Sequence, residues 1–153
     1  KKFTQKHYLV AGGKNRFISV KNGLEKIDSN MKVCIHDGVR PLVSKSLVDN
    51  TMNLVRKGFG VVPVLPVKQS LRIIKDGTSK HINRNNLYHV QTPQCFLSSE
   101  IKQAYSTNYS SFFSDDASVF ENFGGDILTV NGEEKNLKIT TQSDLEIAML
   151  FTK

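Results

Sequence analysis

Apolar positions follow two alternating patterns through the first half of the chain. Short apolar runs at residues 8–11, 32–36 and 59–66 predict strands. The run at 59–66 is nearly continuous, as expected of a strand that is covered on both faces. Between the runs, apolar residues recur at spacings of three and four, which predicts two helices. The helical positions are Phe17, Val20, Leu24 and Ile27 in the first, and Leu47, Val48, Thr51, Leu54 and Val55 in the second. This β-α-β-α-β order predicts an α/β fold with a mostly parallel sheet and right-handed crossovers.

The pattern changes over residues 66–86, which predict a β-hairpin arm. Residues 67–74 alternate loosely, Asp76-Gly77 is typical of a hairpin turn, and residues 80–84 form the returning strand. The arm has little apolar cover and carries five basic side chains. They are Lys68, Arg72, Lys75, Lys80 and Arg84. Because a two-stranded ribbon is marginal by itself, we expect the arm to lie against another surface, and a second subunit is the natural candidate.

The remainder of the chain returns to mixed strands and helices. Strands are predicted at residues 87–90, continuing into 91–96, and at 126–130 and 136–140. A helix is predicted at 98–105, with Ser98 as its N-cap, and a second helix begins after the cap formed by Ser114-Asp115-Asp116. A third helix is predicted at 141–151, with its apolar face made of Leu145, Ala148, Met149 and Phe151. At 153 residues the chain is predicted to be one domain.

Composition narrows the class of protein. The chain is 39% hydrophobic and 23% charged, as is usual for a soluble globular protein. No apolar run approaches a membrane span, and residues 1–7 lack a signal-peptide core, so a cytoplasmic location is the default. The two cysteines, Cys34 and Cys95, lie in apolar stretches without metal-site spacing and are predicted to be reduced, buried and inert.

The net charge of +7 is compatible with nucleic acid, an acidic surface or small phosphorylated ligands. The basic residues are scattered, and no aromatic-rich RNA-binding motif is present, so a nucleic-acid module is poorly supported. The four histidines do not cluster in sequence. No nucleophile elbow or Walker loop occurs, which argues against nucleophilic hydrolysis and P-loop chemistry.

Two stretches carry candidate chemistry. Asp37 and Arg40 follow the strand at 32–36, where ligands gather in open parallel sheets, although a plain Asp-Gly turn is the alternative. Arg40 could bind a carboxylate or phosphate through two parallel N–H groups. Gly12-Gly13 precedes the first helix, whose N-terminus could receive an anion, but a simple turn explains it equally well. Asp115 and Asp116 are better explained by the helix dipole than by a metal.

Five segments occur in the order found in one enzyme family, and together they cover essentially the whole chain. They are Gly12-Gly13 with Arg16 and residues 19–24; residues 36–41 (HDGVRP); residues 83–84 leading to 91–94 (QTPQ); residues 114–118 (SDDAS); and residues 136–140 (NLKIT). In these segments the chain resembles the 2-C-methyl-D-erythritol 4-phosphate cytidylyltransferases of the non-mevalonate isoprenoid pathway.

The resemblance implies a nucleotidyltransferase reaction on a Rossmann-like sheet flanked by helices. CTP and 2-C-methyl-D-erythritol 4-phosphate would give a CDP-linked alcohol and pyrophosphate, with assistance from magnesium. The substrate phosphate attacks the α-phosphorus in line, so the enzyme positions reactants and neutralises charge. By resemblance, Lys138 would stabilise the α-phosphate. The protein would form a homodimer whose subunits are joined through the hairpin arm.

The resemblance also assigns residues to the nucleotide. Gly12, Gly13 and Ser19 would hold the cytosine. Asp37 and Gly38 would meet the ribose and the magnesium region, with Asp37 as the one metal-facing side chain.

Other residues are assigned to the alcohol substrate. Arg40 would lie near the methylerythritol, with Asp37 at the junction of the two pockets. Ser70 and Arg84 would reach the partner's site, where Arg84 would bind the substrate phosphate. Thr92 and Ser114 would line the pocket.

Some features depart from the family. Ser70 and Ser114 stand where threonine is more usual, and Asn83 stands where aspartate is common. The family's first strand and its glycine-rich loop, which clamps the CTP phosphates with an arginine and a lysine, have no match. We therefore expect a fragment of a longer enzyme that is inactive by itself. The alternatives are a ribitol 5-phosphate cytidylyltransferase, a basic nucleic-acid-binding domain and a non-catalytic dimerisation fragment.

Overall fold

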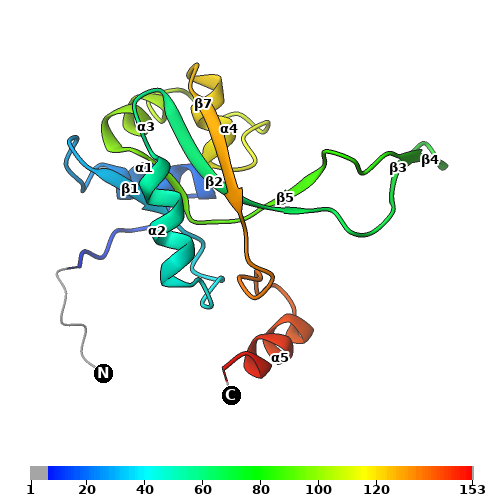
Figure 1. Cartoon of the computed structure of the whole chain (residues 1–153). Helices are drawn as coiled ribbons and strands as arrows, with labels where there is room; N and C mark the ends of the chain where they lie inside the picture. Colours follow the sequence, from blue (N-terminus) through cyan, green and yellow to red (C-terminus); the bar gives the residue numbers. More distant parts are fainter. Residues whose placement is uncertain (1–6, 153) are drawn as a thin grey trace.

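The computed structural model describes residues 7–152 and shows a central sheet with helices packed around it, from which a thin arm extends (Figure 1). The elements in chain order are α1 (Arg16–Leu24), β1 (Lys32–Ile35), α2 (Lys45–Leu54), β2 (Phe59–Pro66), β3 (Leu71–Lys75), β4 (Thr78–Ile82), β5 (Tyr88–Val90), β6 (Gln94–Leu97), α3 (Ser98–Ala104), α4 (Asp116–Asn122), β7 (Asp126–Asn131) and α5 (Gln142–Leu150).

The main sheet has the order β1-β6-β2-β5, with β7 paired to β2. β7 is parallel to β2, whereas β6 is antiparallel to both β1 and β2. β1, β2 and β7 therefore run in one direction, and the predicted α/β class is confirmed, although among residues 7–152 only the β2–β7 ladder of the main sheet joins parallel neighbours. The sequence pattern did not indicate that the later strand β6 would lie between β1 and β2.

β5 and β6 pair with successive parts of the same edge of β2. Val64 of β2 is opposite Val90 of β5, and Val61 is opposite Cys95 of β6. Between these two pairings the chain leaves the ladder at residues 91–93. The polar side chains of residues 91 and 92 therefore lie where β5 ends and before β6 begins, and the candidate site is at this position.

Two predicted strands are wrong. Residues 8–11 form no strand, and the Leu9 side chain is 96% exposed, because the segment lies outside the sheet that would bury it. Residues 136–140 also form no strand: residue 136 is a bend, and residues 137–140 have no regular secondary structure. Their position is fixed by individual contacts, such as the bond from the Ile139 amide to the Val39 carbonyl (2.8 Å).

The principal core joins α1, α3, α4 and β6. Its buried residues are Phe17, Leu24, Phe96, Ile101, Ala104, Tyr105, Val119 and Phe120. The rings of Phe17 and Tyr105 stack with centroids 4.7 Å apart, so α1 is fixed directly against the residue that follows α3. Ser98, predicted as a helix cap, instead accepts a hydrogen bond from the Met31 amide (3.1 Å).

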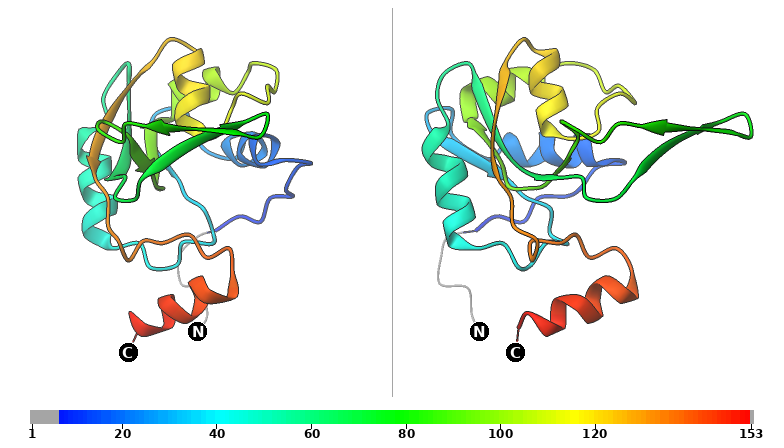
Figure 2. Two further views of the ribbon diagram at one scale, coloured as in Figure 1. Left: turned by 90° about the vertical axis from the view of Figure 1, so that its right-hand side faces the viewer. Right: turned by 45° about the vertical axis from the view of Figure 1, so that its right-hand side comes forward.

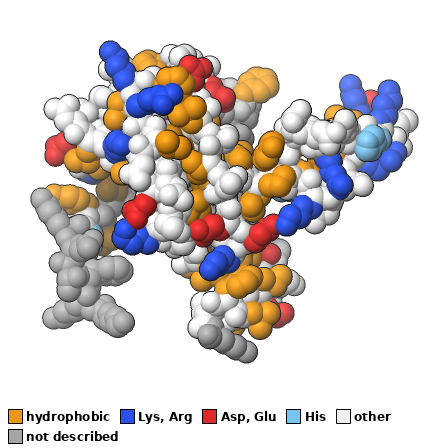
Figure 3. All heavy atoms as spheres, viewed as in Figure 1, with side chains coloured by type: hydrophobic (Ala, Val, Ile, Leu, Met, Phe, Trp, Pro, Cys, Tyr) orange, Lys and Arg blue, Asp and Glu red, His pale blue; other side chains and the backbone are white. Residues whose placement is uncertain are grey.

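The predicted hairpin is present as β3 and β4, which project far from the body of the molecule (Figure 2). Asp76 and Gly77 form its turn with φ values of 49° and 74°. The side chains of Ile73 and Ile74 are 56% and 77% exposed. Basic side chains gather at the tip of the arm (Figure 3).

α5 lies apart from the main sheet (Figure 2). The predicted helix is present, but of the four apolar residues on which it was predicted only Ala148 is buried; Leu145, Met149 and Phe151 are exposed. Over residues 7–152, none of the helices combines the length and the apolar character needed to cross a bilayer.

Candidate active site

The loop after β1 is fixed to the break between β5 and β6. The Asp37 amide donates a hydrogen bond to the Thr92 hydroxyl (3.0 Å), and this hydroxyl lies 3.0 Å from Nδ1 of His36. The other ring nitrogen of His36 lies 2.9 Å from the Arg40 carbonyl oxygen. Because β1 and β6 are paired up to Ile35 and Gln94, the residues beyond this pair come together at one sheet edge.

The Asp37 carboxylate lies among three cations. Its oxygens are 3.3 Å from Arg16 Nε, 3.5 Å from Arg40 Nε and 3.4 Å from Lys138 Nζ. Partial burial alone would raise the pKa of Asp37, but the charges of Arg16 and Lys138 lower it below its usual value. Asp37 is therefore ionised at neutral pH and holds three positive groups around one point.

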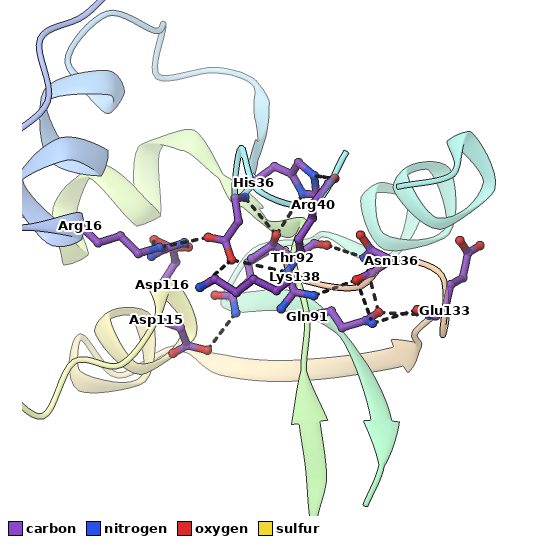
Figure 4. Close-up of polar contacts among 12 residues, drawn as sticks. Arg16, His36, Arg40, Gln91, Thr92, Asp115, Asp116, Glu133, Asn136 and Lys138 are labelled. Atoms are coloured by element: carbon purple, nitrogen blue, oxygen red, sulfur yellow. Dashed lines mark hydrogen bonds and ion pairs between the residues drawn. The ribbon is translucent and has the colours of Figure 1, made fainter. Parts of the chain in front are cut away.

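Arg16 reaches this point from α1 and is itself anchored by a buried acid. Its two terminal nitrogens bind the Asp116 carboxylate at 2.9 and 2.6 Å (Figure 4), and Asp116 is fully buried. The Tyr105 hydroxyl donates to the same carboxylate (2.5 Å). Burial opposes the charge of Arg16, but the bonds to Asp116 raise the pKa of the guanidinium, while burial and the nearby Asp116 charge raise the pKa of Tyr105.

A second network holds the segment that carries Lys138. Arg40 donates to the Asn136 carbonyl (2.8 Å), and the Asn136 side-chain amide donates to the Thr92 carbonyl (2.8 Å). The side-chain amide of Gln91 donates to the backbone carbonyls of Glu133 (2.9 Å) and Asn136 (3.3 Å). Figure 4 shows these side chains converging from the break after β5 and from the segment after β7. The buried side chains of Gln91 and Asn136 thus replace the strand pairing predicted for residues 136–140.

These side chains enclose a polar pocket of about 260 Å³. It is lined by Arg16, Asp37, Arg40, Val90, Gln91, Thr92, Gln94, Ser114, Asp115 and Lys138. Three cations and two carboxylates face it, so the pocket suits a phosphorylated polar molecule better than an apolar one.

The structure brings five of the predicted site residues to this pocket: Asp37, Arg40, Thr92, Ser114 and Lys138. The sequence-based site did not include Arg16, Gln91 or Gln94, although all three belong to segments that carry the resemblance. Arg16 could have been found as a cation at the predicted anion-binding end of the first helix, where it is the first helical residue. For Gln91 and Gln94, the one signal in the sequence was that polar residues interrupt the apolar pattern of the strand predicted there.

Of the predicted cytosine-binding residues, Gly12 and Gly13 lie on the loop before α1 and Ser19 lies in its first turn, and all three are outside the pocket lining. The Gly13 amide donates to the Ser19 hydroxyl (2.9 Å). A Cβ at Gly13 would lie 2.2 Å from the side chain of Ile18, so glycine is required there for packing as well as for any ligand. Gly12 would tolerate a Cβ 3.4 Å from Ser19 Oγ. Around Gly38, a Cβ would meet no atom of residues 7–152 within 4 Å.

Ser70 and Arg84 lie on the arm and are exposed, away from the pocket of the same chain. The Arg84 guanidinium donates to the Lys68 carbonyl. Their assignment to a partner's site stays a prediction.

Residues 7–152 contain no cluster of three or more His, Cys, Asp or Glu side chains arranged to hold a metal. Of the two pocket carboxylates, Asp115 is engaged as the cap of α4: it accepts from the Ser118 amide (2.9 Å) and from Gln94 (2.8 Å). The contacts of the Asp37 carboxylate with Arg16, Arg40 and Lys138 are longer, at 3.3–3.5 Å, so Asp37 is the more available ligand. One carboxylate fits Mg²⁺ that takes most of its ligands from substrate phosphates and water, as is usual for this ion.

Comparison with known proteins gives a consistent result. The model of the family "IspD: 2-C-methyl-D-erythritol 4-phosphate cytidylyltransferase" matches residues 2–153. The chain is 45% identical over 145 residues to the 2-C-methyl-D-erythritol 4-phosphate cytidylyltransferase of Azobacteroides pseudotrichonymphae, covering 93% of this chain and 64% of that protein. It is 40% identical over 150 residues to the enzyme of the same name from Porphyromonas gingivalis, covering 97% and 68%. The chain therefore spans about two thirds of the length of these relatives.

Solved structures agree in fold. The crystal structure of 2-C-methyl-D-erythritol 4-phosphate cytidylyltransferase from Thermus thermophilus matches with a TM-score of 0.81 and 30% identity, over 92% of this chain and 71% of that one. A crystal structure of 4-diphosphocytidyl-2C-methyl-D-erythritol synthase matches with a TM-score of 0.82 and 25% identity, over 93% and 69%.

Proposed function

The chain belongs to the 2-C-methyl-D-erythritol 4-phosphate cytidylyltransferase family, and from this we propose that the protein transfers a cytidylyl group from CTP to 2-C-methyl-D-erythritol 4-phosphate in isoprenoid biosynthesis. The observation that carries the proposal is the single carboxylate of Asp37 in contact with Arg16, Arg40 and Lys138. Phosphoryl-type transfer needs fixed positive charge around the reacting phosphates rather than a protein nucleophile.

In the proposed reaction, an oxygen of the alcohol's phosphate attacks the α-phosphorus of CTP. A new P–O bond forms as the bond from the α-phosphorus to the bridging oxygen breaks, and pyrophosphate leaves. Lys138 would neutralise charge that develops on the α-phosphate. Its side chain is 48% exposed at the pocket and only 3.4 Å from Asp37, so Nζ can exchange this ion pair for a phosphate.

Asp37 and Arg40 have positioning roles in this proposal. Asp37 would face the ribose and fix Arg16, Arg40 and Lys138 before substrate binds, which lowers the cost of organising charge during the reaction. Arg40 would face the alcohol, while the hydroxyls of Thr92 and Ser114 would bind its polar groups. Gly12, Gly13, Ser19 and Gly38 would hold the nucleotide next to this pocket.

We propose Mg²⁺ as the cofactor. Asp37 would be its protein ligand, with CTP phosphates completing the site. When bound, the ion supplies positive charge to the phosphate oxygens. The two pocket carboxylates and the engagement of Asp115 as a helix cap support a metal shared with the substrate rather than one caged by the protein.

We also propose a homodimer in which the arm of one subunit delivers Ser70 and Arg84 to the other subunit's site. The exposed Ile73 and Ile74 on the projecting arm support a contact with a second copy. The cytoplasmic location expected from the sequence stays a prediction.

The proposal is tested by measuring pyrophosphate release with the intact protein. CTP with 2-C-methyl-D-erythritol 4-phosphate and Mg²⁺ should give turnover, and omission of Mg²⁺ should abolish it. Ribitol 5-phosphate in place of methylerythritol phosphate should give a much smaller kcat/KM. Preference for ribitol 5-phosphate, or no turnover with either alcohol, would overturn the proposed activity.

A further inference from the structure

The two cysteines of the chain, which the sequence pattern predicts to be inert, lie directly opposite each other. Cys34 of β1 and Cys95 of β6 are partners in the antiparallel register, and their Sγ atoms are 2.9 Å apart. Direct partners in an antiparallel ladder have Cα atoms about 4.5–5.5 Å apart, within the range of about 4.4–6.8 Å that a disulfide requires. The backbone therefore already has the separation of a cross-strand disulfide.

The two thiols differ in access and in acidity. Cys95 is fully buried, since β6 lies between β1 and β2 and Cys95 is also opposite Val61. Cys34 is only partly buried. The hydrogen bond with Cys95 lowers the pKa of the Cys34 thiol, whereas the same bond and burial raise the pKa of Cys95. Cys34 is thus the thiol that can meet a reagent, because the thiolate is the attacking species.

We propose that Cys34 and Cys95 form a redox modification site that is oxidised to a cross-strand disulfide by small-molecule disulfides such as oxidised glutathione. The Cys34 thiolate attacks one glutathione sulfur, the glutathione S–S bond breaks, and one glutathione thiolate leaves. Cys95 then loses its proton to solvent and attacks the Cys34 sulfur, the bond from Cys34 to glutathione breaks, and the second glutathione leaves as a thiolate that is protonated by solvent. The two cysteines are oxidised to one disulfide, and one glutathione disulfide is reduced to two thiols.

The site lies in the strands that lead to the pocket. Cys34 is three residues before Asp37, and Cys95 is three residues after Thr92, whose hydroxyl binds the Asp37 amide. A disulfide at this position joins covalently the two strands that the Asp37–Thr92 hydrogen bond joins at their ends. This inference uses no step of the proposed cytidylyl transfer, and its failure would leave that proposal unchanged.

The test is to incubate the folded intact protein with oxidised glutathione, block the remaining thiols with an alkylating reagent and measure its mass. We expect the mass to fall by two hydrogens, a peptide cross-link between Cys34 and Cys95, and full reversal by a dithiol reductant. Any further cysteines outside residues 1–153 are replaced by serine beforehand. A stable glutathione adduct in the parent protein, a bond only between molecules, or two thiols that remain alkylatable would each overturn the inference.

Single variants test the order of the two steps. Cys95→Ser should stop at one glutathione on Cys34, because no resolving thiol is left. Cys34→Ser should acquire no glutathione while folded, because Cys95 is buried, yet should react after unfolding in urea. If a serine at the buried position prevents folding, Cys95→Ala serves for the first variant. Equal labelling of both single variants in the folded state would contradict the proposed roles.

Discussion

At the scale of single residues, Asp37 shows how one carboxylate can organise several cations. Its three ion pairs are 3.3–3.5 Å long, and Arg16 is held in turn by the buried Asp116. Long contacts of this kind are weaker than direct charge-assisted hydrogen bonds, so a phosphate can compete for the same cations. The arrangement thus combines preorganised charge with exchangeable partners.

We expect the pKa of Asp37, followed by carboxyl-carbon NMR, to lie below the value of about 3.9 for an unperturbed aspartate. Arg16→Ala should move it upward, because the variant removes the largest opposing charge. Since the folded pKa is depressed, the stability that Asp37 contributes is present above about pH 3.9 and is lost as the pH falls through the folded pKa. Arg56→Ala, whose guanidinium instead lies 4.4 Å over the Phe59 ring, is the control and should leave the titration unchanged.

Lys138→Ala should lower kcat on the order of 100- to 1,000-fold, the range for loss of one preorganised charge-stabilising group. Lys135→Ala removes a nearby exposed lysine that is outside the pocket lining and should retain full activity. Both are measured by pyrophosphate release with the intact protein. Equal losses in the two variants would show that general charge, and not the position of Lys138, matters.

The place of a single residue in the site was predictable where the residues that act together are close in sequence. Asp37 and Arg40 follow the end of one strand within four residues, so strand and loop signals sufficed. Arg16 binds Asp116 across 100 residues, and periodicity contains no information about such a contact. Cys34 and Cys95 were judged separately for the same reason.

At the scale of elements, β6 determines how closely β2 can approach the core. A Cβ on Gly60 would lie 2.4 Å from the Phe96 ring, and Phe96 is fully buried. Helix and strand identities were largely predictable because caps and apolar spacing are local. The strands predicted at 8–11 and 136–140 were wrong because strand formation depends on a partner, which a local pattern does not specify.

Gly60→Ala should lower the free energy of unfolding by about 1–3 kcal/mol, because the new methyl group must displace the Phe96 ring or the strand. Gly23→Ala is the matched control: its Cβ meets no atom of residues 7–152 within 4 Å, and alanine in a helix should stabilise by about 0.5–1 kcal/mol. Urea unfolding monitored by circular dichroism compares them. A Gly60→Ala protein as stable as the parent would contradict this account of the contact.

At the scale of the whole molecule, the arm and α5 extend from the sheet and expose apolar side chains (Figure 3). The sequence indicated the arm through its turn residues and its basic strands. It did not indicate that most apolar residues of α5 would be exposed, because an apolar stripe predicts a buried face without identifying what covers it.

If the arm completes the partner's site, two strongly impaired variants should restore each other. Lys138→Ala and Arg84→Ala homodimers should each have strongly reduced turnover, and subunit exchange should produce dimers in which one pocket has both wild-type residues. Recovery of activity on mixing measures this directly. Lys80→Ala, a nearby arm lysine not assigned to the site, should remain active by itself; no recovery in a verified mixed dimer would place Arg84 in its own subunit's site.

The position of β6 has a consequence for synthesis on the ribosome. Among residues 7–152, β1 pairs with β6 alone, and the paired Cys34 and Cys95 are 61 residues apart. β1 and β2 are therefore translated early, but β6, the strand that lies between them, is available only after the whole arm has emerged. During that interval the nascent chain exposes apolar strand edges, which are prone to wrong pairing. The protein's vulnerability to misfolding is thus concentrated in the time needed to translate the arm.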